Sequence, residues 1–482
     1  MRILHVASEL APFAKTGGLA DVLAGLAPAL AAAGHEVIVA VPRYRSMMHG
    51  NEPAGVAQRL RKFAVQLGGS RLEVGLWEGA FPGQPRARMW LIDHPPSFDR
   101  DGIYGPPSGG DFSDNARRFA LLDRAALDIA HELDLWPDVV HAHDWQAGPA
   151  LLYALRPPVD RVRPRRVFTI HNLAFQGLFP PSVVDELGLP REQFTPDGYE
   201  FWGKVSFLKA GIAVADSITT VSPRYAEEIK GLEAGCGLDG MLRAQAAKLT
   251  GIVNGIDEQV WNPASDPYLG CSYETTSLQL KRGCKSSLQR ALGLPQRTDL
   301  PLIGSVARIT EQKGFDLVAK ALPRLLQEGL QYVVLGTGDP ALVQQLRELE
   351  AAHPQAVRVR IGFDEELAHR IVAGSDLYLM PSRFEPCGLN QLYAQAYGTP
   401  PIVRATGGLY DTVVDFDQKS DSGTGFMFDA YTEVALEATV RRAIVTWRDR
   451  KAFARLQRRG MEQDFSWREP AKQYQRLYRP VP

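Results

Sequence analysis

The sequence has 482 residues, more than one hydrophobic core usually supports, so its length predicts two domains. Its composition, 45% hydrophobic and 23% charged, excludes a disordered or fibrous protein. With 54 basic and 55 acidic residues, no global field favours nucleic acid or an anionic membrane, so any recognition by charge must be local.

Neither the cysteines nor the N-terminus indicates export or a zinc ribbon. The four cysteines form no C-x-x-C pair, which argues against a zinc site and a disulfide framework. The opening residues, MRILHVAS, are typical of a buried strand rather than a cleaved leader, and no 18 apolar residues run uninterrupted. We therefore expect a cytoplasmic protein.

Short apolar runs rich in β-branched residues alternate with amphipathic stretches through the first half of the chain. One such stretch, NARRFALLDRAALDIAHEL at 115–133, has the spacing of a helix. This alternation predicts β-α-β units and a parallel sheet. The expected strands lie at 2–7, 35–42, 87–94, 137–144, 165–172, 216–223 and 248–255.

The same alternation restarts in the second half, after a turn-rich stretch at 254–266. We therefore predict an α/β protein with two doubly wound domains. Ligands of open parallel sheets bind beyond the carboxyl ends of the strands, so two such sheets facing each other would enclose a cleft. The expected strands are 301–308, 332–339, 356–363, 376–382 and 400–406.

The first strand leads into FAKTGGLADV, in which Lys15, Gly17 and Gly18 precede a helical pattern. Free amides at the start of that helix, beside Lys15, would suit an anion. The stretch is not a P-loop, because G-x-x-x-x-G-K-[ST] is absent. Spacing alone leaves two interpretations open, a phosphate site and a plain turn from strand to helix.

A second glycine pattern, G-x-G-x-x-A at Gly336, Gly338 and Ala341, superficially matches the dinucleotide fingerprint. That fingerprint belongs to the first unit of a Rossmann domain, whereas here it opens the second. Pro340 also suits the first turn of an ordinary helix. A nicotinamide-dependent dehydrogenase is therefore a disfavoured alternative.

Two histidine-containing strand ends are further candidates. His141 and His143 share one face of a strand that ends at Asp144, but a third ligand with metal-like spacing is missing. Polar residues at a strand end are thus favoured over a metal site. His171, beside Asn172 at the next strand end, is by spacing alone more often structural than catalytic.

In the second half, Arg308 and Lys313 follow a strand, and Glu385 comes just before a helix expected to open at Cys387 to Leu389. Two cations together with helix-terminal amides would neutralise a diphosphate, and a carboxylate would hold sugar hydroxyls. The alternative for the two cations is ordinary solvation at the surface.

Together these residues resemble the bacterial glycogen synthase family, also called starch synthase. The resemblance runs from about residue 1 to 480, and its motifs occur in the family's order. They are KTGGLADV, HAHDW, TIHNLAFQG, TTVSPRYAEEI, GIVNGID, ARITEQKGFDL, LGTGD and AGSDLYLMPSRFEPCGLNQLYAQAYGTPPIVRATGGLYDTV.

The resemblance implies a retaining glycosyltransferase of the two-domain B fold, in which two Rossmann-like domains face each other across a cleft. It implies transfer of glucose from ADP-glucose to the non-reducing end of an α-1,4-glucan, with release of ADP and with no cofactor or metal. It also implies an acceptor-side domain at 1–253, a donor-binding domain at 254–460 and a helix at 461–482 that crosses back to the first domain.

The family's functional positions are carried over residue by residue. The resemblance implies catalytic roles for His171, Glu385, Arg308 and Lys313, with Glu385 and His171 holding the glucose. It assigns the donor to Lys15, Gly17, Gly18, Asn254, Cys387, Gly388 and Leu389, and the acceptor to Glu9, Asp21, Tyr104, Asp144 and Asn172.

Two positions depart from the family pattern. Gln146 replaces a histidine after HAHDW, and Asn390 replaces a threonine after CGL. Neither has one of the roles above, so the departures bear on fine donor or acceptor preference. A non-catalytic glucan-binding protein on the same fold is the competing hypothesis, and the retained charges argue against it.

Overall fold

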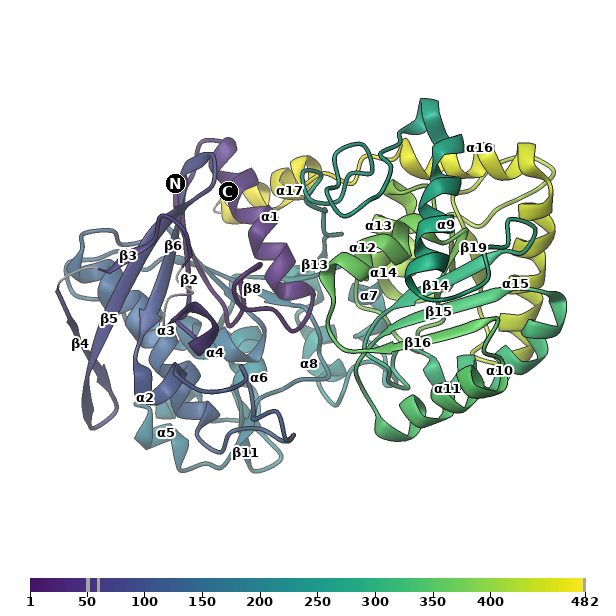
Figure 1. Cartoon of the computed structure of the whole chain (residues 1–482). Coiled ribbons are helices and arrows are strands. Elements are labelled where there is room, and N and C mark those ends of the chain that lie inside the picture. Colours follow the sequence, from purple (N-terminus) through teal and green to yellow (C-terminus); the bar gives the residue numbers. More distant parts are fainter. Residues whose placement is uncertain (49–52, 59–60, 480–482) are drawn as a thin grey trace. The chain divides into compact units, whose positions relative to one another are not determined.

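The computed structural model describes residues 1–48, 53–58 and 61–479. The chain divides into two compact units, Met1–Gly255 with Trp467–Pro482, and Ile256–Ser466. Figure 1 shows each unit as a sheet with helices packed on it. No helix among the described residues is long and apolar enough to cross a membrane. The last three residues of the expected segment 461–482 lie outside the described residues.

The first unit, formed by the N-terminal half, is built on a large mixed sheet. Its strands follow the order β13-β12-β8-β7-β1-β2-β6-β5-β3, with β4 beside β5. Pairing is parallel from β13 to β6 and antiparallel from β6 outward. A small separate sheet has the order β10-β11-β9. The strands are β1 Arg2–Val6, β2 Glu36–Pro42, β3 Ala57–Gln58, β4 Phe63–Leu67, β5 Ser70–Phe81, β6 Gln84–Asp93, β7 Val139–His143, β8 Arg165–Ile170, β9 Leu178–Phe179, β10 Glu200–Phe201, β11 Lys204–Ser206, β12 Ser217–Thr220 and β13 Leu249–Gly251.

The helices of the first unit bury apolar faces against this sheet. In the first of them, Leu19, Val22, Leu23, Leu26 and Leu30 recur at helical spacing, and all five are buried. The helices are α1 Gly18–Ala32, α2 Pro95–Phe98, α3 Asn115–Glu132, α4 Asp144–Tyr153, α5 Val183–Glu186, α6 Phe207–Val214, α7 Pro223–Glu228, α8 Asp239–Ala244 and α17 Arg468–Tyr478.

The C-terminal helix α17 is part of the first unit. Tyr474 and Tyr478 are buried there, and the Tyr478 hydroxyl lies 2.8 Å from Nδ1 of His141. Trp467 packs so closely on α1 that a Cβ added at Gly25 would lie 1.9 Å from its Nε1. Any side chain at position 25 would therefore displace the tryptophan.

The second unit has a sheet in which every pairing is parallel, in the order β16-β15-β14-β17-β18-β19. Successive residues of β14 point to opposite faces, so Ile303 and Leu302 join different hydrophobic clusters. Figure 1 shows α10 and α11 on one side of this sheet and α9 and α12 on the other. The strands are β14 Leu302–Val306, β15 Gln331–Gly336, β16 Val357–Ile361, β17 Leu377–Met380, β18 Pro401–Arg404 and β19 Phe426–Phe428, and the helices are α9 Lys281–Ala291, α10 Phe315–Leu325, α11 Pro340–Ala352, α12 Glu365–Gly374, α13 Asn390–Ala396, α14 Gly407–Thr412, α15 Glu433–Arg448 and α16 Arg450–Met461.

The predicted fold class is confirmed, since both units carry parallel sheets with crossover helices. One local expectation is wrong. The helix expected to open at Cys387 begins at Asn390, and Gly388, with φ +73°, holds the preceding residues in a turn. The amides of residues 387–389 therefore belong to a loop rather than to the first turn of a helix.

Candidate functional site

In the second unit, two loops at the carboxyl edge of the sheet bring Lys313 and Glu385 together. One loop follows β14 and the other follows the neighbouring strand β17. They are joined by a bond from the Arg383 amide to the Gln312 carbonyl (2.8 Å). Gly314, with φ +78°, lies against Pro381, where a Cβ would be 2.1 Å from the carbonyl oxygen. The two loops thus pack against each other and form one surface.

Lys313 and Glu385 form an ion pair within this surface. The lysine Nζ lies 2.8 and 2.6 Å from the two carboxylate oxygens, and the Ser382 hydroxyl donates to the same carboxylate at 3.0 Å. The Glu385 side chain is 5% exposed and that of Lys313 is 20% exposed. A buried carboxylate thus fixes the position of the ammonium group that lies nearer to solvent.

Arg308 lies on the same loop as Lys313, but it has a different environment. It is exposed, and among the described residues no hydrogen bond or ion pair to its side chain is formed. Its backbone is nonetheless held, because the neighbouring Ile309 donates to Thr337 O at 2.8 Å and accepts from the Asp339 amide at 2.8 Å. Arg308 is therefore a solvated cation on an ordered backbone.

This backbone contact also explains the glycine pattern that resembled a dinucleotide fingerprint. A Cβ at Gly336 would lie 1.9 Å from the carbonyl oxygen of Ala307, and one at Gly338 would lie 2.1 Å from that of Ile309. The first free amides of α11 are capped by the Asp339 side chain, at 2.8 and 3.2 Å. The glycines serve chain packing, so this stretch gives the dehydrogenase alternative no support.

The loop before α13 is tied to the same edge of the sheet. Asn390, which departs from the family pattern, donates from Nδ2 to the carbonyl of Val306 at the end of β14. Gln391 donates to the carbonyls of Cys387 and Gly388 at 3.1 and 3.0 Å. Asn390 thus anchors the helix start, and its amide group is engaged within the protein.

In the first unit, Lys15 lies in the loop between β1 and α1. Its Nζ is 2.8 Å from Oδ1 of Asp21, and both side chains are about one quarter exposed, 24% and 23%. Gly17 and Gly18 are exposed, and a Cβ at Gly17 would meet nothing within 4 Å. Gly17 has φ −156°, which any residue adopts, so no left-handed turn requires a glycine there. The space beside this backbone is open.

The buried carboxylate of Glu9 holds that loop in place by hydrogen bonds. It accepts the amides of Thr16 at 2.7 Å and Gly17 at 3.2 Å, together with the Thr16 hydroxyl at 2.6 Å. The Tyr104 hydroxyl donates to it at 2.5 Å. The amide of Gly17 is therefore bonded to a protein carboxylate and is not one of the free amides expected at the start of this helix.

Asp144 occupies a strained position at the end of β7. Its φ is +57°, in the left-handed region that non-glycine residues seldom adopt. Its carboxylate accepts the amides of His171 at 2.7 Å and Asn172 at 3.3 Å. Burial raises the pKa of Asp144 to about 7 although these amides oppose the shift. The carboxylate thus holds the backbone at the end of the next strand, β8.

Asn254 lies at the other end of the first unit's chain, after β13. Its side chain is buried, and Oδ1 has no hydrogen-bond partner among the described residues. An unpaired buried amide oxygen is costly, so it is a feature of the kind found where a ligand group binds.

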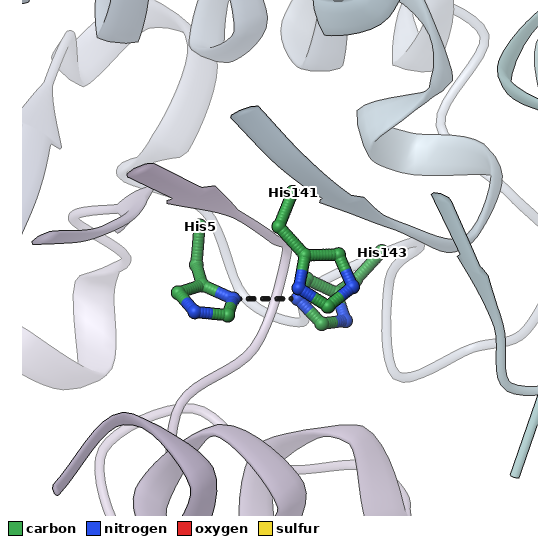
Figure 2. A group of neighbouring side chains, drawn as sticks. All are labelled: His5, His141 and His143. Carbon is green, nitrogen blue, oxygen red and sulfur yellow. Dashed lines mark hydrogen bonds between the residues drawn. The ribbon is translucent and has the colours of Figure 1, made fainter. Parts of the chain in front are cut away.

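Sequence reasoning missed a cluster of buried imidazoles around His171. His5 and His141 are paired neighbours on β1 and β7, and His143 lies two residues further on. Figure 2 shows His5, His141 and His143 side by side, with a hydrogen bond joining His5 to His143. His5 is the third histidine of this cluster, and it lies far from the HAHDW motif in the sequence. The order of the strands, which places β1 beside β7, was the signal that could have found it.

These three imidazoles are poorly arranged to bind a metal ion, although their ligand atoms lie within 4.8 Å of one another. The rings of His141 and His143 are stacked, with centroids 4.2 Å apart and planes at 29°. The in-plane lone pairs of stacked rings run side by side instead of converging on one point. Both nitrogens of His141 are also hydrogen-bonded, to Tyr478 and Thr169.

Comparison with known proteins matches both halves of the chain. Residues 2–244 match the family model of the starch synthase catalytic domain, and residues 293–459 match glycosyl transferases group 1. The chain is 50% identical to a glycogen synthase of Anaeromyxobacter dehalogenans over 99% of each chain. It is 48% identical to one of Alkalilimnicola ehrlichii over 100% of this chain and 99% of that protein.

A solved structure resembles the whole chain. It is the catalytic domain of starch synthase IV from Arabidopsis thaliana bound to ADP and acarbose. The TM-score is 0.91 and the sequence identity 34%, and the match covers 99% of this chain and 98% of that one.

Proposed function

The chain belongs to the glycogen synthase (starch synthase) family of glycosyltransferases, and from this premise we propose that it transfers glucose from ADP-glucose to the non-reducing end of an α-1,4-glucan. The anomeric configuration is retained and ADP is released. The similarity to glycogen synthases over nearly the full length supports the reaction, and the similarity to a starch synthase bound to ADP and acarbose supports the choice of donor and acceptor.

The observation that carries this proposal is the pair of cations on the loop after β14. Cleavage of a sugar–diphosphate bond builds negative charge on the leaving phosphate and positive charge at the anomeric carbon. Lys313 is fixed by Glu385, and Arg308 is exposed with no protein partner among the described residues. Positive charge placed at the leaving group stabilises the transition state without a metal ion.

Glu385 and His171 act on the sugar. The Glu385 carboxylate, oriented by Lys313 and Ser382, accepts hydrogen bonds from glucose hydroxyls. Burial lowers the pKa of His171 to about 3, so its imidazole is neutral at neutral pH and acts as a hydrogen-bonding group. The acceptor hydroxyl attacks the anomeric carbon from the face on which the diphosphate leaves. The bond from that carbon to the phosphate oxygen breaks and the hydroxyl proton passes to the departing phosphate, which accounts for retention without a protein nucleophile.

The acceptor glucan binds along the first unit. In this proposal the acceptor residues are Tyr104, Asp144 and Asn172. Tyr104 bonds to Glu9, which holds the loop before α1, and Asp144 accepts the amide of Asn172 at the end of β8. Asp21, the ion-pair partner of Lys15, is a further acceptor residue in this proposal. Asn254, whose buried Oδ1 has no hydrogen-bond partner among the described residues, completes the donor side. Closure of the two units on the donor would exclude water, which would otherwise hydrolyse the activated sugar. The proposed location is the cytoplasm.

The direct test of this function is incorporation of labelled glucose into glycogen or a maltodextrin from ADP-glucose and, separately, from UDP-glucose. We expect transfer from ADP-glucose, an α-1,4 linkage in the product and no dependence on a nicotinamide. Binding of glucan without transfer from either donor would instead support the non-catalytic scaffold.

Lys15→Ala is expected to lower kcat/KM for ADP-glucose by at least ~10-fold, because one cation at the donor diphosphate is lost. Steady-state kinetics with a saturating maltodextrin measure the effect. Lys472→Ala is the matched control, since Lys472 is an exposed lysine of α17 whose one ion pair among the described residues is with Glu469 at 3.3 Å. An unchanged kcat/KM in Lys15→Ala would leave Lys15 as a surface partner of Asp21 and nothing more.

A further inference from the structure

Three histidines form a chain of hydrogen bonds that ends at the proposed sugar site. Nδ1 of His5 lies 3.0 Å from Nε2 of His143, and Nδ1 of His143 lies 3.0 Å from Nε2 of His171. His5 and His143 are fully buried, whereas His171 is half-buried. The rings come from three neighbouring strands, β1, β7 and the end of β8. A path of imidazoles thus leads from the interior of the first unit to its surface.

All three rings are neutral, which couples their hydrogen bonds. Burial lowers the pKa of His5 and His171 to about 3 and that of His143 well below its usual value. A neutral imidazole has one N–H donor and one acceptor nitrogen. If His143 accepts on Nε2 it must donate from Nδ1, and the reverse also holds. The tautomer of one ring therefore dictates the tautomers of the other two.

The buried end of this chain of hydrogen bonds, at His5, decides between the two directions in which the rings can donate. Nε2 of His5 has no hydrogen-bond partner among the described residues. If the chain donated toward His5, that nitrogen would carry an unpaired buried N–H, a group that folded proteins rarely leave unsatisfied. If the chain donates toward His171, Nε2 of His5 is a bare acceptor and no N–H is orphaned inside the protein. The second direction is thus favoured.

We propose that His5 and His143 are positioning residues that hold His171 in the tautomer with its proton on Nδ1, so that His171 donates a hydrogen bond to an oxygen of the transferred glucose. Among the described residues, no protein group hydrogen-bonds to Nδ1 of His171. The Asp144 carboxylate fixes the backbone amide of the same residue at 2.7 Å. Asp144 thus holds the backbone of His171, and His143 holds its ring. The part concerning glucose rests on the function proposed above.

His141 provides a built-in comparison. Its ring stacks on that of His143, but its two nitrogens bond to the Tyr478 hydroxyl at 2.8 Å and the Thr169 hydroxyl at 2.6 Å. A hydroxyl both donates and accepts, so it imposes no tautomer. His141 belongs to the same buried cluster but not to the chain that reaches His171.

The first test is nuclear magnetic resonance of the wild-type protein labelled with ¹⁵N in its histidines, with signals assigned through single variants. Protonated and bare ring nitrogens have well-separated ¹⁵N shifts, so each tautomer is read directly. We expect the proton on Nδ1 in His5, His143 and His171. A proton on Nε2 of His171, or exchange between both forms, would overturn the proposal. A zinc titration that shifted these signals stoichiometrically would also overturn it, in favour of a metal site.

The second test separates positioning from packing. His5→Leu removes the donor and is expected to lower kcat by ~3–10-fold, the range for one hydrogen bond, with KM for ADP-glucose changed by less than ~2-fold. His5→Asn, whose side-chain amide places an N–H near the position of Nδ1, is expected to restore kcat to within ~2-fold. His141→Leu, the matched control, should lower the melting temperature and leave kcat unchanged.

The outcomes distinguish this inference from the proposed function. Equal kcat losses in His5→Leu and His5→Asn would reduce His5 to a packing role and contradict the proposal. If His5→Leu fails to fold, the tautomers of the wild-type protein and the kinetics of His5→Asn still decide whether His5 positions His171. If wild-type protein transfers no glucose, the proposed function fails, while the tautomer measurement still tests the chain of histidines by itself.

Discussion

Replacing Lys313 with alanine is expected to lower kcat for glucosyl transfer from ADP-glucose by about 10²–10³-fold, because a fixed donor aimed at the leaving phosphate contributes about 3–4 kcal/mol to the transition state. The lysine Nζ lies 2.6–2.8 Å from both oxygens of Glu385, so its position is set before the donor binds. Little reorganisation is then needed when charge develops on the phosphate. Steady-state kinetics with a maltodextrin acceptor measure this effect.

Lys313→Ala is also expected to reduce stability. It leaves the Glu385 carboxylate, which is 5% exposed, with Ser382 as its remaining described donor. An unsatisfied buried acceptor costs about 1–3 kcal/mol, so the melting temperature should fall. Lys320→Ala is the matched control, because Lys320 is an exposed lysine on the following helix. A variant with wild-type kcat and a lowered melting temperature would show that Lys313 serves the fold alone.

Arg308→Ala is expected to cause a comparable loss of kcat, about 10²–10³-fold, but with no change in melting temperature. The difference follows from the environment of the side chain. Arg308 is exposed and forms no hydrogen bond or ion pair from its side chain among the described residues, so its removal costs the folded protein no polar interaction there. Kinetics and thermal unfolding on the same preparation check both halves of this prediction.

Arg347→Ala is the control for that variant, since Arg347 is an exposed arginine on α11, away from the loop after β14. We expect it to match wild type in both measurements. Retention of full activity by Arg308→Ala would refute the proposed diphosphate site, since Arg308 is the cation there with the least structural role.

The fold was largely predictable because its strands are short, apolar and rich in β-branched residues. The helix expected at 115–133 is Asn115–Glu132, and every parallel strand that was expected is present within a few residues. The antiparallel strands β3, β4, β5, β9, β10 and β11 were missed, and so was the short parallel strand β19. In β4 the burial alternates residue by residue, a weaker signal than the continuous apolar runs of the buried strands.

The candidate site was predictable as a set of residues but not as a set of contacts. Lys313 and Glu385 are 72 residues apart, and their ion pair depends on β14 and β17 being neighbours in the sheet. No spacing rule indicates that Glu9 accepts the amide of Gly17. Side-chain partners of this kind depend on strand order and loop geometry, whereas periodicity reports only which face of an element is buried.

His5 illustrates the same limit. In the sequence it is one polar residue between Leu4 and Val6 of an apolar strand, and its spacing from HAHDW does not indicate a shared cluster. It acquires a partner only through the order of the strands, which places β1 beside β7. A strand-end motif such as HAHDW is therefore best interpreted together with the residues opposite it in the predicted sheet.

The central proposal is that cations from both units bind one diphosphate, Lys15 from the first unit and Arg308 from the second. A crystal structure of the protein with ADP-glucose, grown without a glucan acceptor, tests it most directly. We expect the Lys15 ammonium and the Arg308 guanidinium each to contact oxygens of the same diphosphate. A bound donor with Lys15 pointing away from it and still paired only with Asp21 would contradict the proposal.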